Sequence, residues 1–263
     1  MSARKVSAGN GIGWLSAAVQ LLLKNPAPFA MMGLVMAVAG IVPILGSLAL
    51  GILGPALYGG IATAARTQSR DGSARFEQLF QVFQQEGKLG PMLVLCLPGI
   101  IGGVLAVVLL VILVAVVMAG AGVSSMTDSA TALWGSLGIG GLVMMSLILV
   151  LAVVVFMLTF FAIPAVMFNR IDAIEAMRQS LRASLANLGA LLLYLLALML
   201  AALVLALLLS VLSSYLAQLL VSVLLFPVIG ASMYLAWKDV FGETTEELPV
   251  IEGDGADGGG MVA

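Results

Sequence analysis

The chain has 263 residues, of which 62% are hydrophobic and 9% are charged, whereas an ordinary soluble domain has about 25% charged residues. The charges are confined to short segments between long apolar runs, which excludes a single water-soluble core and predicts a membrane-embedded chain. Histidine is absent and cysteine occurs once, at Cys96, which excludes Ser-His catalysis, H-E-x-x-H zinc sites and an intrachain disulfide.

The uncharged runs predict six transmembrane helices when compared with the roughly 20 apolar residues that cross a hydrocarbon core. The run from Ala27 to Ala65 is about twice that length, with Pro43 and Gly46 near its middle, and therefore predicts two spans joined by a tight turn. The block from Leu188 to Trp237 is similarly long and is interrupted at residues 213–215. The predicted spans are 28–44, 47–66, 91–118, 138–168, 188–211 and 215–237.

The sequence therefore predicts an all-α polytopic membrane protein whose six spans form three hairpins, in a transmembrane domain over residues 27–241. All 11 basic residues fall in segments that this topology places on one side of the membrane. Because basic residues mark cytoplasmic loops, both termini are expected in the cytoplasm. Residues 1–26 are the predicted cytoplasmic N-terminus, and the acidic, glycine-rich residues 242–263 are expected to be a disordered cytoplasmic tail.

Three segments on the cytoplasmic side have the pattern of short amphipathic helices that lie flat on the membrane surface. The first has an apolar face made of Phe76, Leu79, Phe80 and Phe83. The second begins at Asp172, a predicted N-cap with Glu175 in the capping-box position, and its apolar face is made of Ile174, Met177, Leu181 and Leu185. A weaker third example lies within residues 1–26, with Ser16, Gln20 and Lys24 on its polar face.

An amphipathic helix followed by a hairpin thus occurs three times, and the second helix of each hairpin contains a proline: Pro55, Pro164 or Pro227. Two explanations stay open. The pattern fits an internal repeat, and it also fits the general use of proline in membrane helices for packing.

The predicted spans contain no ionisable Asp, Glu, Lys or Arg between their ends, which argues against a proton-coupled or voltage-driven machine. Their polar side chains include Tyr58, Thr159 and Gln218, a candidate intramembrane polar cluster. Such groups serve either as hydrogen-bonding contacts between helices or as part of a substrate site. We expect no catalytic residues, no cofactor, no metal site and no nucleic-acid partner.

Membrane lipids are the expected partners. Five arginines on the cytoplasmic side are candidate contacts for anionic lipid headgroups: Arg66, Arg70, Arg75, Arg178 and Arg182. The alternative is that they only fix the topology. The sequence does not decide whether a protein partner or a second copy of the chain also binds.

Four segments carry a resemblance to a known group: GWLSAAVQLLLKNP, IVPILGSLALGILGPALYGGI, RDGSARFEQLF and FNRIDAIEAMRQSLRASLANLGAL. In these the chain resembles the uncharacterised six-span inner-membrane proteins of bacteria that include the YciC-like proteins. It is distantly similar to the membrane domain attached to some glycerophosphodiester phosphodiesterases. The resemblance covers nearly the whole chain except the acidic tail, and its motifs are structural. It implies a bacterial inner (plasma) membrane location and brings no active-site residues with it.

Two functions are compatible with these features. The first is a non-enzymatic membrane scaffold or envelope-organising protein that recognises a lipid or a partner at its cytoplasmic face. The alternative is a facilitative transporter or channel for a small solute or lipid, with a path along the proline-interrupted helices. A polar cavity reaching the middle of the membrane would favour transport.

Overall fold

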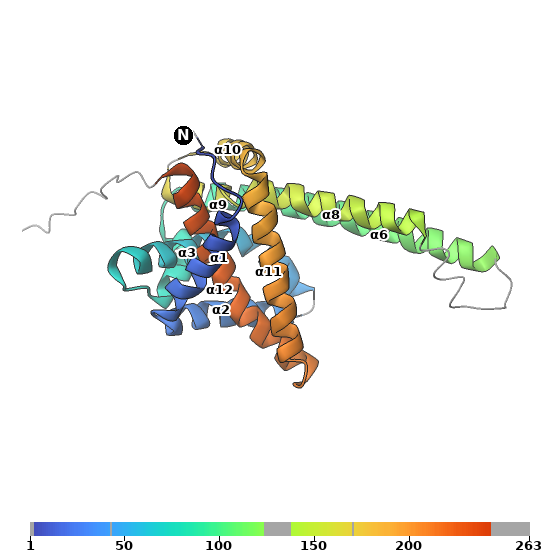
Figure 1. Ribbon diagram of the computed structural model, residues 1–263, viewed down its shortest axis with the longest axis horizontal. Coiled ribbons are helices and arrows are strands. Elements are labelled where there is room, and N and C mark those ends of the chain that lie inside the picture. The colour runs from blue at the N-terminus through green and yellow to red at the C-terminus, as the bar shows by residue number, and fades with distance from the viewer. Residues whose placement is uncertain (1–2, 43, 124–137, 170, 243–263) are drawn as a thin grey trace, which may run out of the picture.

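The computed structural model describes residues 3–42, 44–123, 138–169 and 171–242, and every regular element in these ranges is a helix (Figure 1). The first half contains α1 (Asn10–Leu23), α2 (Pro26–Ile41), α3 (Leu45–Asp71), the 3-10 helix η1 (Phe76–Phe80), α4 (Gln81–Gln84), α5 (Leu89–Val94) and α6 (Leu97–Val123). The second half contains α8 (Ile139–Thr159), α9 (Ala162–Phe168), α10 (Ala173–Ala186), α11 (Leu188–Leu208) and α12 (Ser214–Phe241).

Several of these helices are long and apolar enough to cross a membrane, which fits a multi-pass membrane protein. Five described stretches meet this test on their own: Leu45–Asp71, Leu89–Ala115, Gly140–Phe168, Leu188–Leu208 and Ser214–Phe241. A sixth is obtained only if α1 and α2, which meet at 110°, count as one broken span. The total of six spans and their arrangement in three hairpins therefore stay predictions.

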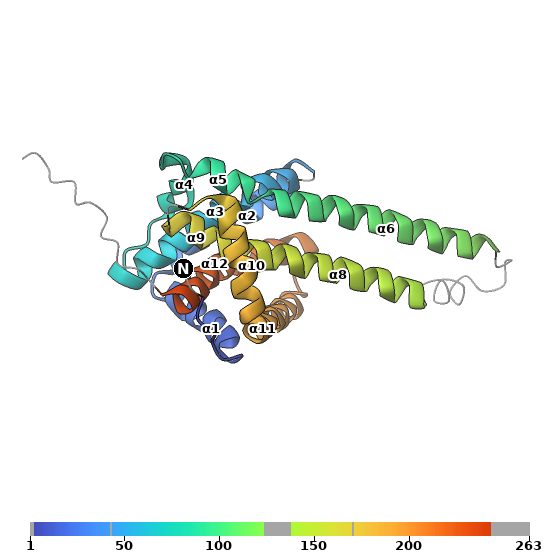
Figure 2. The ribbon, with the colours of Figure 1, turned by 90° about the horizontal axis from the view of Figure 1, so that it is seen from above.

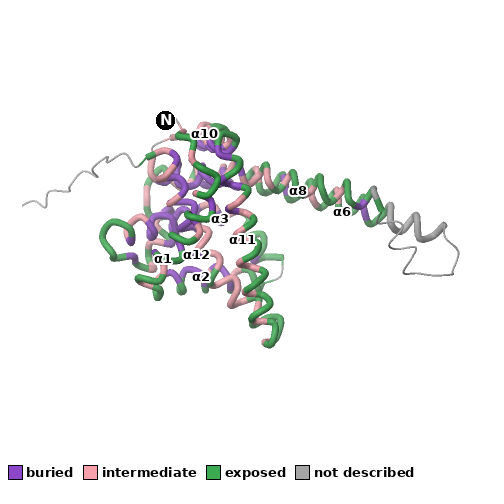
Figure 3. Tube along the Cα trace, viewed as in Figure 1, coloured by how far each residue is buried: buried purple, intermediate pink, exposed green. Residues whose placement is uncertain are grey.

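The long helices diverge from a common end of the fold. Helices α6 and α8 lie side by side and extend away from the other helices (Figures 1 and 2). Helix α11 starts near the same end and runs crosswise to them in Figure 1, with α12 beside it. Helices α1, α2, α3 and α12 pack together where these elements meet, and the buried residues concentrate there (Figure 3).

Two of the predicted spans are interrupted near the common end, in both cases by a proline. Pro98 has no N–H to donate to the carbonyl of Val94, and α5 ends at Val94. Pro164 likewise leaves the carbonyl of Phe160 without its helical partner, and α8 ends at Thr159 before α9 begins. Pro55 and Pro227 lie inside helices that continue, α3 and α12.

The core is made of aromatic rings between closely packed helices. Phe160 lies between Phe161 and Tyr194, with ring centroids 5.0 and 5.2 Å away, and all three side chains are fully buried. At Gly33 of α2, an added Cβ would collide with the Val223 carbonyl of α12. The absence of a side chain at Gly33 therefore allows α2 and α12 to approach closely.

Candidate functional site

The basic residues lie at or near the ends of helices, and these helix ends meet on one side of the fold, which we call the basic end. Lys88 connects α5 to the end of α9, because its Nζ donates to the carbonyls of Val166 at 2.7 Å and Asn169 at 3.2 Å. The α1–α2 corner joins the segment after α3, because Asn25 Nδ2 donates to the Ala74 carbonyl at 3.2 Å. The described basic residues of this end are Arg4, Lys5, Lys24, Arg66, Arg70, Arg75, Lys88, Arg178, Arg182 and Lys238.

Residues 4–6, which we call the N-terminal strap, bind to both α12 and the α10–α11 junction. The Arg4 N–H donates to the Val240 carbonyl at 2.8 Å. Asn187 accepts from the Val6 N–H on Oδ1 at 2.7 Å and donates through Nδ2 to the Arg4 carbonyl at 3.1 Å. The buried Asn187 amide thus binds the strap as a neighbouring strand would.

Asp239, in the last turn of α12, receives three further hydrogen bonds. Arg4 Nη2 donates to one carboxylate oxygen at 2.6 Å, and Asn10 Nδ2 and Trp14 Nε1 donate to the other at 2.7 and 3.0 Å. These bonds fasten the first turns of α1 to α12. Helix α1 is therefore packed into the fold on one side, where its buried residues are Gly11, Trp14, Ala18 and Leu21.

The five candidate arginines have different surroundings. The guanidinium of Arg66 lies 4.8 Å from the centroid of the Phe168 ring, which in turn packs on Trp237. This side chain is half-buried and is held inside the protein by a cation–π contact. The other four are exposed at the basic end: Arg70, Arg75, Arg178 and Arg182.

Helix α10 forms as predicted from Asp172, whose Oδ2 accepts a hydrogen bond from the Ile174 N–H at 3.1 Å. Glu175 accepts from Gln179 Nε2 at 3.1 Å, one turn later. The face that packs into the protein is made of small residues: Ala173, Ala176, Ser180, Ala183 and Ser184. Of the predicted apolar face, Ile174 and Leu185 are turned outward, 54% and 60% exposed, next to Arg178 and Arg182. Met177 is partly buried against the core, and Leu181 is partly buried.

Two serines on the buried face of α10 satisfy the backbone at the α8–α9 break. Ser180 Oγ donates to the Met157 carbonyl at 2.7 Å and accepts from the Phe161 N–H at 3.1 Å. Ser184 Oγ donates to the same carbonyl at 3.2 Å. These bonds place α10 across the base of the α6–α8 hairpin, the end at which the two helices join the rest of the fold (Figure 2).

The segment predicted as an amphipathic helix around Phe76 is short and partly 3-10 in geometry. It docks on α3, because Leu79 and Val82 are fully buried and Gln78 Nε2 donates to Thr67 Oγ1 at 2.8 Å. Phe80 and Phe83 are exposed, with ring centroids 6.4 Å apart. This segment therefore presents two aromatic rings at the surface of the basic end.

Tyr58, Thr159 and Gln218, the candidate intramembrane cluster, make contacts in three different places. Tyr58 of α3 packs against the Phe226 ring of α12 at 6.4 Å. Thr159 Oγ1 donates to the Val155 carbonyl of its own helix at 3.0 Å. Gln218 is exposed, and its Nε2 donates to Ser222 Oγ one turn along α12 at 3.3 Å.

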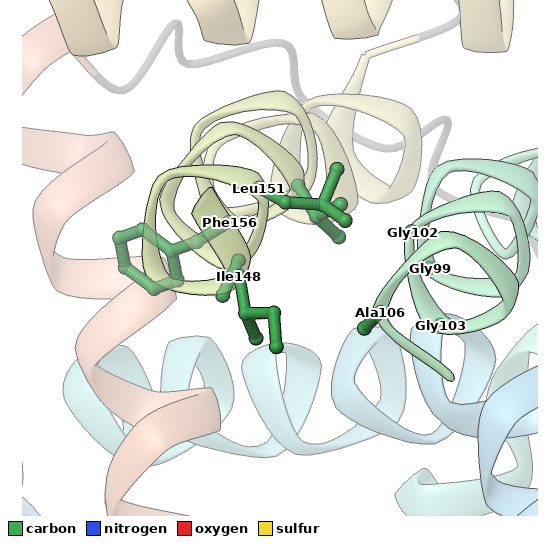
Figure 4. A pocket seen from close by; sticks show the side chains of 9 residues that line it. Gly99, Gly102, Gly103, Ala106, Ile148, Leu151 and Phe156 are labelled. Carbon is green, nitrogen blue, oxygen red and sulfur yellow. The ribbon is translucent and has the colours of Figure 1, made fainter. Parts of the chain in front are cut away.

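An apolar groove with a volume of about 330 Å³ lies between α6 and α8, near the base of their hairpin (Figure 4). One wall is made of small residues of α6, namely Gly99, Gly102, Gly103 and Ala106. The facing wall comes from α8 and is made of Ile148, Leu151, Ala152, Val155 and Phe156. None of these nine side chains carries a polar atom, so the groove offers only van der Waals contacts from side chains.

Sequence reasoning missed Asn187, Asp239 and Ser180, which make the long-range hydrogen bonds at the basic end. The only sequence signal was a polar residue beside an apolar run, as at Asn187 immediately before the fifth predicted span. Within the described ranges, no three His, Cys, Asp or Glu side chains converge as a metal site would require. Arg170, Asp128, Trp134 and the predicted tail after Gly242 lie outside the described residues.

No protein-family model matches this sequence, and no curated protein and no solved structure matches it either.

Proposed function

We propose that the chain is a non-enzymatic scaffold of the bacterial inner membrane, with both termini in the cytoplasm and its basic end against the anionic inner leaflet. The observation that carries this proposal is the exposure of the longest apolar helices. In the most apolar stretch of each of these helices, only a small share of the residues is buried inside the protein. That share is 6% in Leu89–Ala115, 11% in Gly140–Phe168 and 11% in Leu188–Leu208. Surfaces of this kind need lipid or another apolar partner around them.

The basic end supports the proposed orientation and the lipid partner. Basic residues cluster on cytoplasmic segments of membrane proteins, and each one near an anionic surface contributes about 1 kcal/mol to binding. Four arginines are exposed at this end: Arg70, Arg75, Arg178 and Arg182. On α10, exposed Ile174 and Leu185 lie next to two of them, an arrangement suited to the boundary between headgroups and hydrocarbon.

The alternative, a facilitative transporter or channel, has less support. A solute path needs polar groups that replace the water around the solute. The α6–α8 groove has only apolar side chains, and the contacts of Tyr58, Thr159 and Gln218 described above lie in three different places and do not form a shared lining. The proposed inner-membrane location also agrees with the resemblance to the YciC-like proteins.

Reconstitution of the full chain tests the proposal. In vesicles that contain phosphatidylcholine and a little headgroup-labelled phosphatidylglycerol, a scaffold with a lipid-ordering basic end increases self-quenching of the label. The variant with Arg70, Arg75, Arg178 and Arg182 all changed to Gln should lose most of that increase, whereas changing Lys5 and Lys24 to Gln should reduce it less. Efflux of trapped glycerol and trapped fluorescent dye should equal that of protein-free vesicles. Selective solute efflux without lipid redistribution would instead establish the transporter.

A further inference from the structure

We propose that the α6–α8 groove is a binding site for one acyl chain of an anionic phospholipid whose headgroup lies at the basic end, beside α10. This inference rests on the membrane orientation in the proposed function and adds to it a defined lipid site.

The shape of the groove selects a thin apolar occupant. The two helices touch within it, because a Cβ added at Gly102 would lie 2.7 Å from Cγ2 of Val155. A second helix, about 10–12 Å across with its side chains, does not fit between helices in such contact. An extended hydrocarbon chain is narrow enough to follow the space beside the glycines (Figure 4).

The position of the groove along the helices places its occupant in one leaflet. Gly99 and Ala106 are about 10 Å apart along the helix axis, roughly one third of the hydrocarbon thickness. The groove residue Phe156 immediately precedes Met157, whose carbonyl accepts a hydrogen bond from Ser180 of α10 at the basic end. A chain in the groove therefore has its headgroup at that end.

The charge near the base of the hairpin favours an anionic headgroup. Helix α10 crosses there, because Ser180 and Ser184 both bind the Met157 carbonyl, one residue after the groove residue Phe156. The charged residues of α10 are Asp172 and Glu175 at its start and the exposed Arg178 and Arg182, which lie two residues before and two residues after Ser180. The two arginines are therefore nearer along the helix to the Met157 contact than the two carboxylates, and Glu175 is already engaged with Gln179.

The end of the groove next to α10 is rigid. Phe156 lines it and packs against Phe160 and Tyr194, with ring centroids 4.7 and 6.2 Å away. Phe160 and Tyr194 are fully buried, so Phe156 rests on the aromatic core. A preformed wall of this kind lowers the entropy cost of binding a flexible chain.

Photocross-linking of lipids to the full chain in nanodiscs tests the site. The probes are phosphatidylglycerol and phosphatidylcholine, each with a diazirine on one acyl chain, and mass spectrometry locates the adducts. We expect adducts concentrated on residues 99–106 and 148–156 and a preference for phosphatidylglycerol of up to about thirtyfold, the factor that two near-surface cations supply. Equal labelling by both probes would overturn the headgroup assignment.

Matched variants separate the groove from bulk lipid contact. Ala106→Phe fills the groove from α6 and Ala152→Phe fills it from α8, and each should abolish the concentrated adducts. Val107→Phe is the control, since Val107 is 60% exposed on the same helix and lies outside the groove. Adducts that persist in both groove variants would show that lipids contact the hairpin without a site.

The headgroup is tested separately. Arg178→Gln with Arg182→Gln should remove the preference for phosphatidylglycerol and leave phosphatidylcholine adducts in place, while Lys5→Gln with Lys24→Gln should preserve the preference. An unchanged preference in the arginine variant would overturn the role of α10. If the lipid self-quenching described above persists while the adducts spread evenly, the scaffold proposal survives and the groove site fails.

Discussion

Arg4 and Asp239 are 235 positions apart in the chain and form an ion pair of 2.6 Å at the basic end. The side chain of Arg4 is 68% exposed, and that of Asp239 is 23% exposed. Exposed ion pairs contribute about 0–1 kcal/mol, so this pair alone does not hold the N-terminal strap in place. The buried amide of Asn187 makes the stronger connection.

Asn187→Ala is therefore expected to release the strap, whereas Arg4→Gln leaves it largely in place. The alanine variant leaves the backbone groups of Arg4 and Val6 without their partner, at a cost of about 1–3 kcal/mol. Hydrogen exchange measured by mass spectrometry should show faster exchange of residues 4–6 in Asn187→Ala. Asn25→Ala, at the other end of α1, is the control. Equal exchange rates of residues 4–6 in all variants would contradict the role of Asn187 in holding the strap.

Ser180→Ala is expected to destabilise the α8–α9 break by about 1–3 kcal/mol, because the buried Phe161 N–H loses its hydrogen bond to Ser180 Oγ. Ser184→Ala should cost less, since the Met157 carbonyl keeps its hydrogen bond from Ser180. The measurement is the unfolding midpoint of the purified chain in detergent. Equal midpoints for the two variants would show that the Phe161 N–H does not depend on Ser180.

Gly60→Ala is expected to push η1 away from α3, because an added Cβ would collide with the Leu79 carbonyl. The cost of such overpacking is about 1–3 kcal/mol. Gly51→Ala, on the same helix, has open space around the new Cβ and should be neutral or slightly stabilising through helix propensity. Thermal melting in detergent compares the two, and a loss of stability at Gly51 alone would contradict the packing.

Reporter fusions test the predicted topology. A fusion that ends after Lys238 should report the cytoplasm, and one that ends after Asp128 should report the opposite side. The first position belongs to the basic end, and the second lies between two predicted spans. Reports from the same compartment would contradict the predicted number of spans between them.

Part of the fold could be predicted from sequence because charge and hydropathy are sorted along the chain. The N-cap at Asp172 followed from residue type, and its hydrogen bond to the Ile174 N–H confirms it. The span predicted over 188–211 agrees with α11, at Leu188–Leu208. These features depend on local sequence alone.

Other features depend on contacts that a sequence does not show. Apolar periodicity could not indicate that α10 buries alanine and serine and turns Ile174 and Leu185 outward, because hydrocarbon as well as protein can cover an apolar face. The break after Thr159 needed both Pro164 and the compensating hydrogen bond from Ser180. The groove forms where two helices that are distant in sequence face each other, and Gly99 and Gly103 alone did not indicate it.

The most direct test measures what surrounds the exposed apolar helices. Nitroxide labels are placed at Val111 of α6, Val150 of α8 and Val204 of α11, with Lys24 as the control and Cys96 replaced by Ala. These three valines are 61%, 59% and 53% exposed. Power-saturation spectroscopy in lipid vesicles should find all three labels more accessible to oxygen than to a water-soluble nickel chelate, with the reverse at Lys24. Nickel accessibility at any of the three as high as at Lys24 would contradict a chain embedded in hydrocarbon.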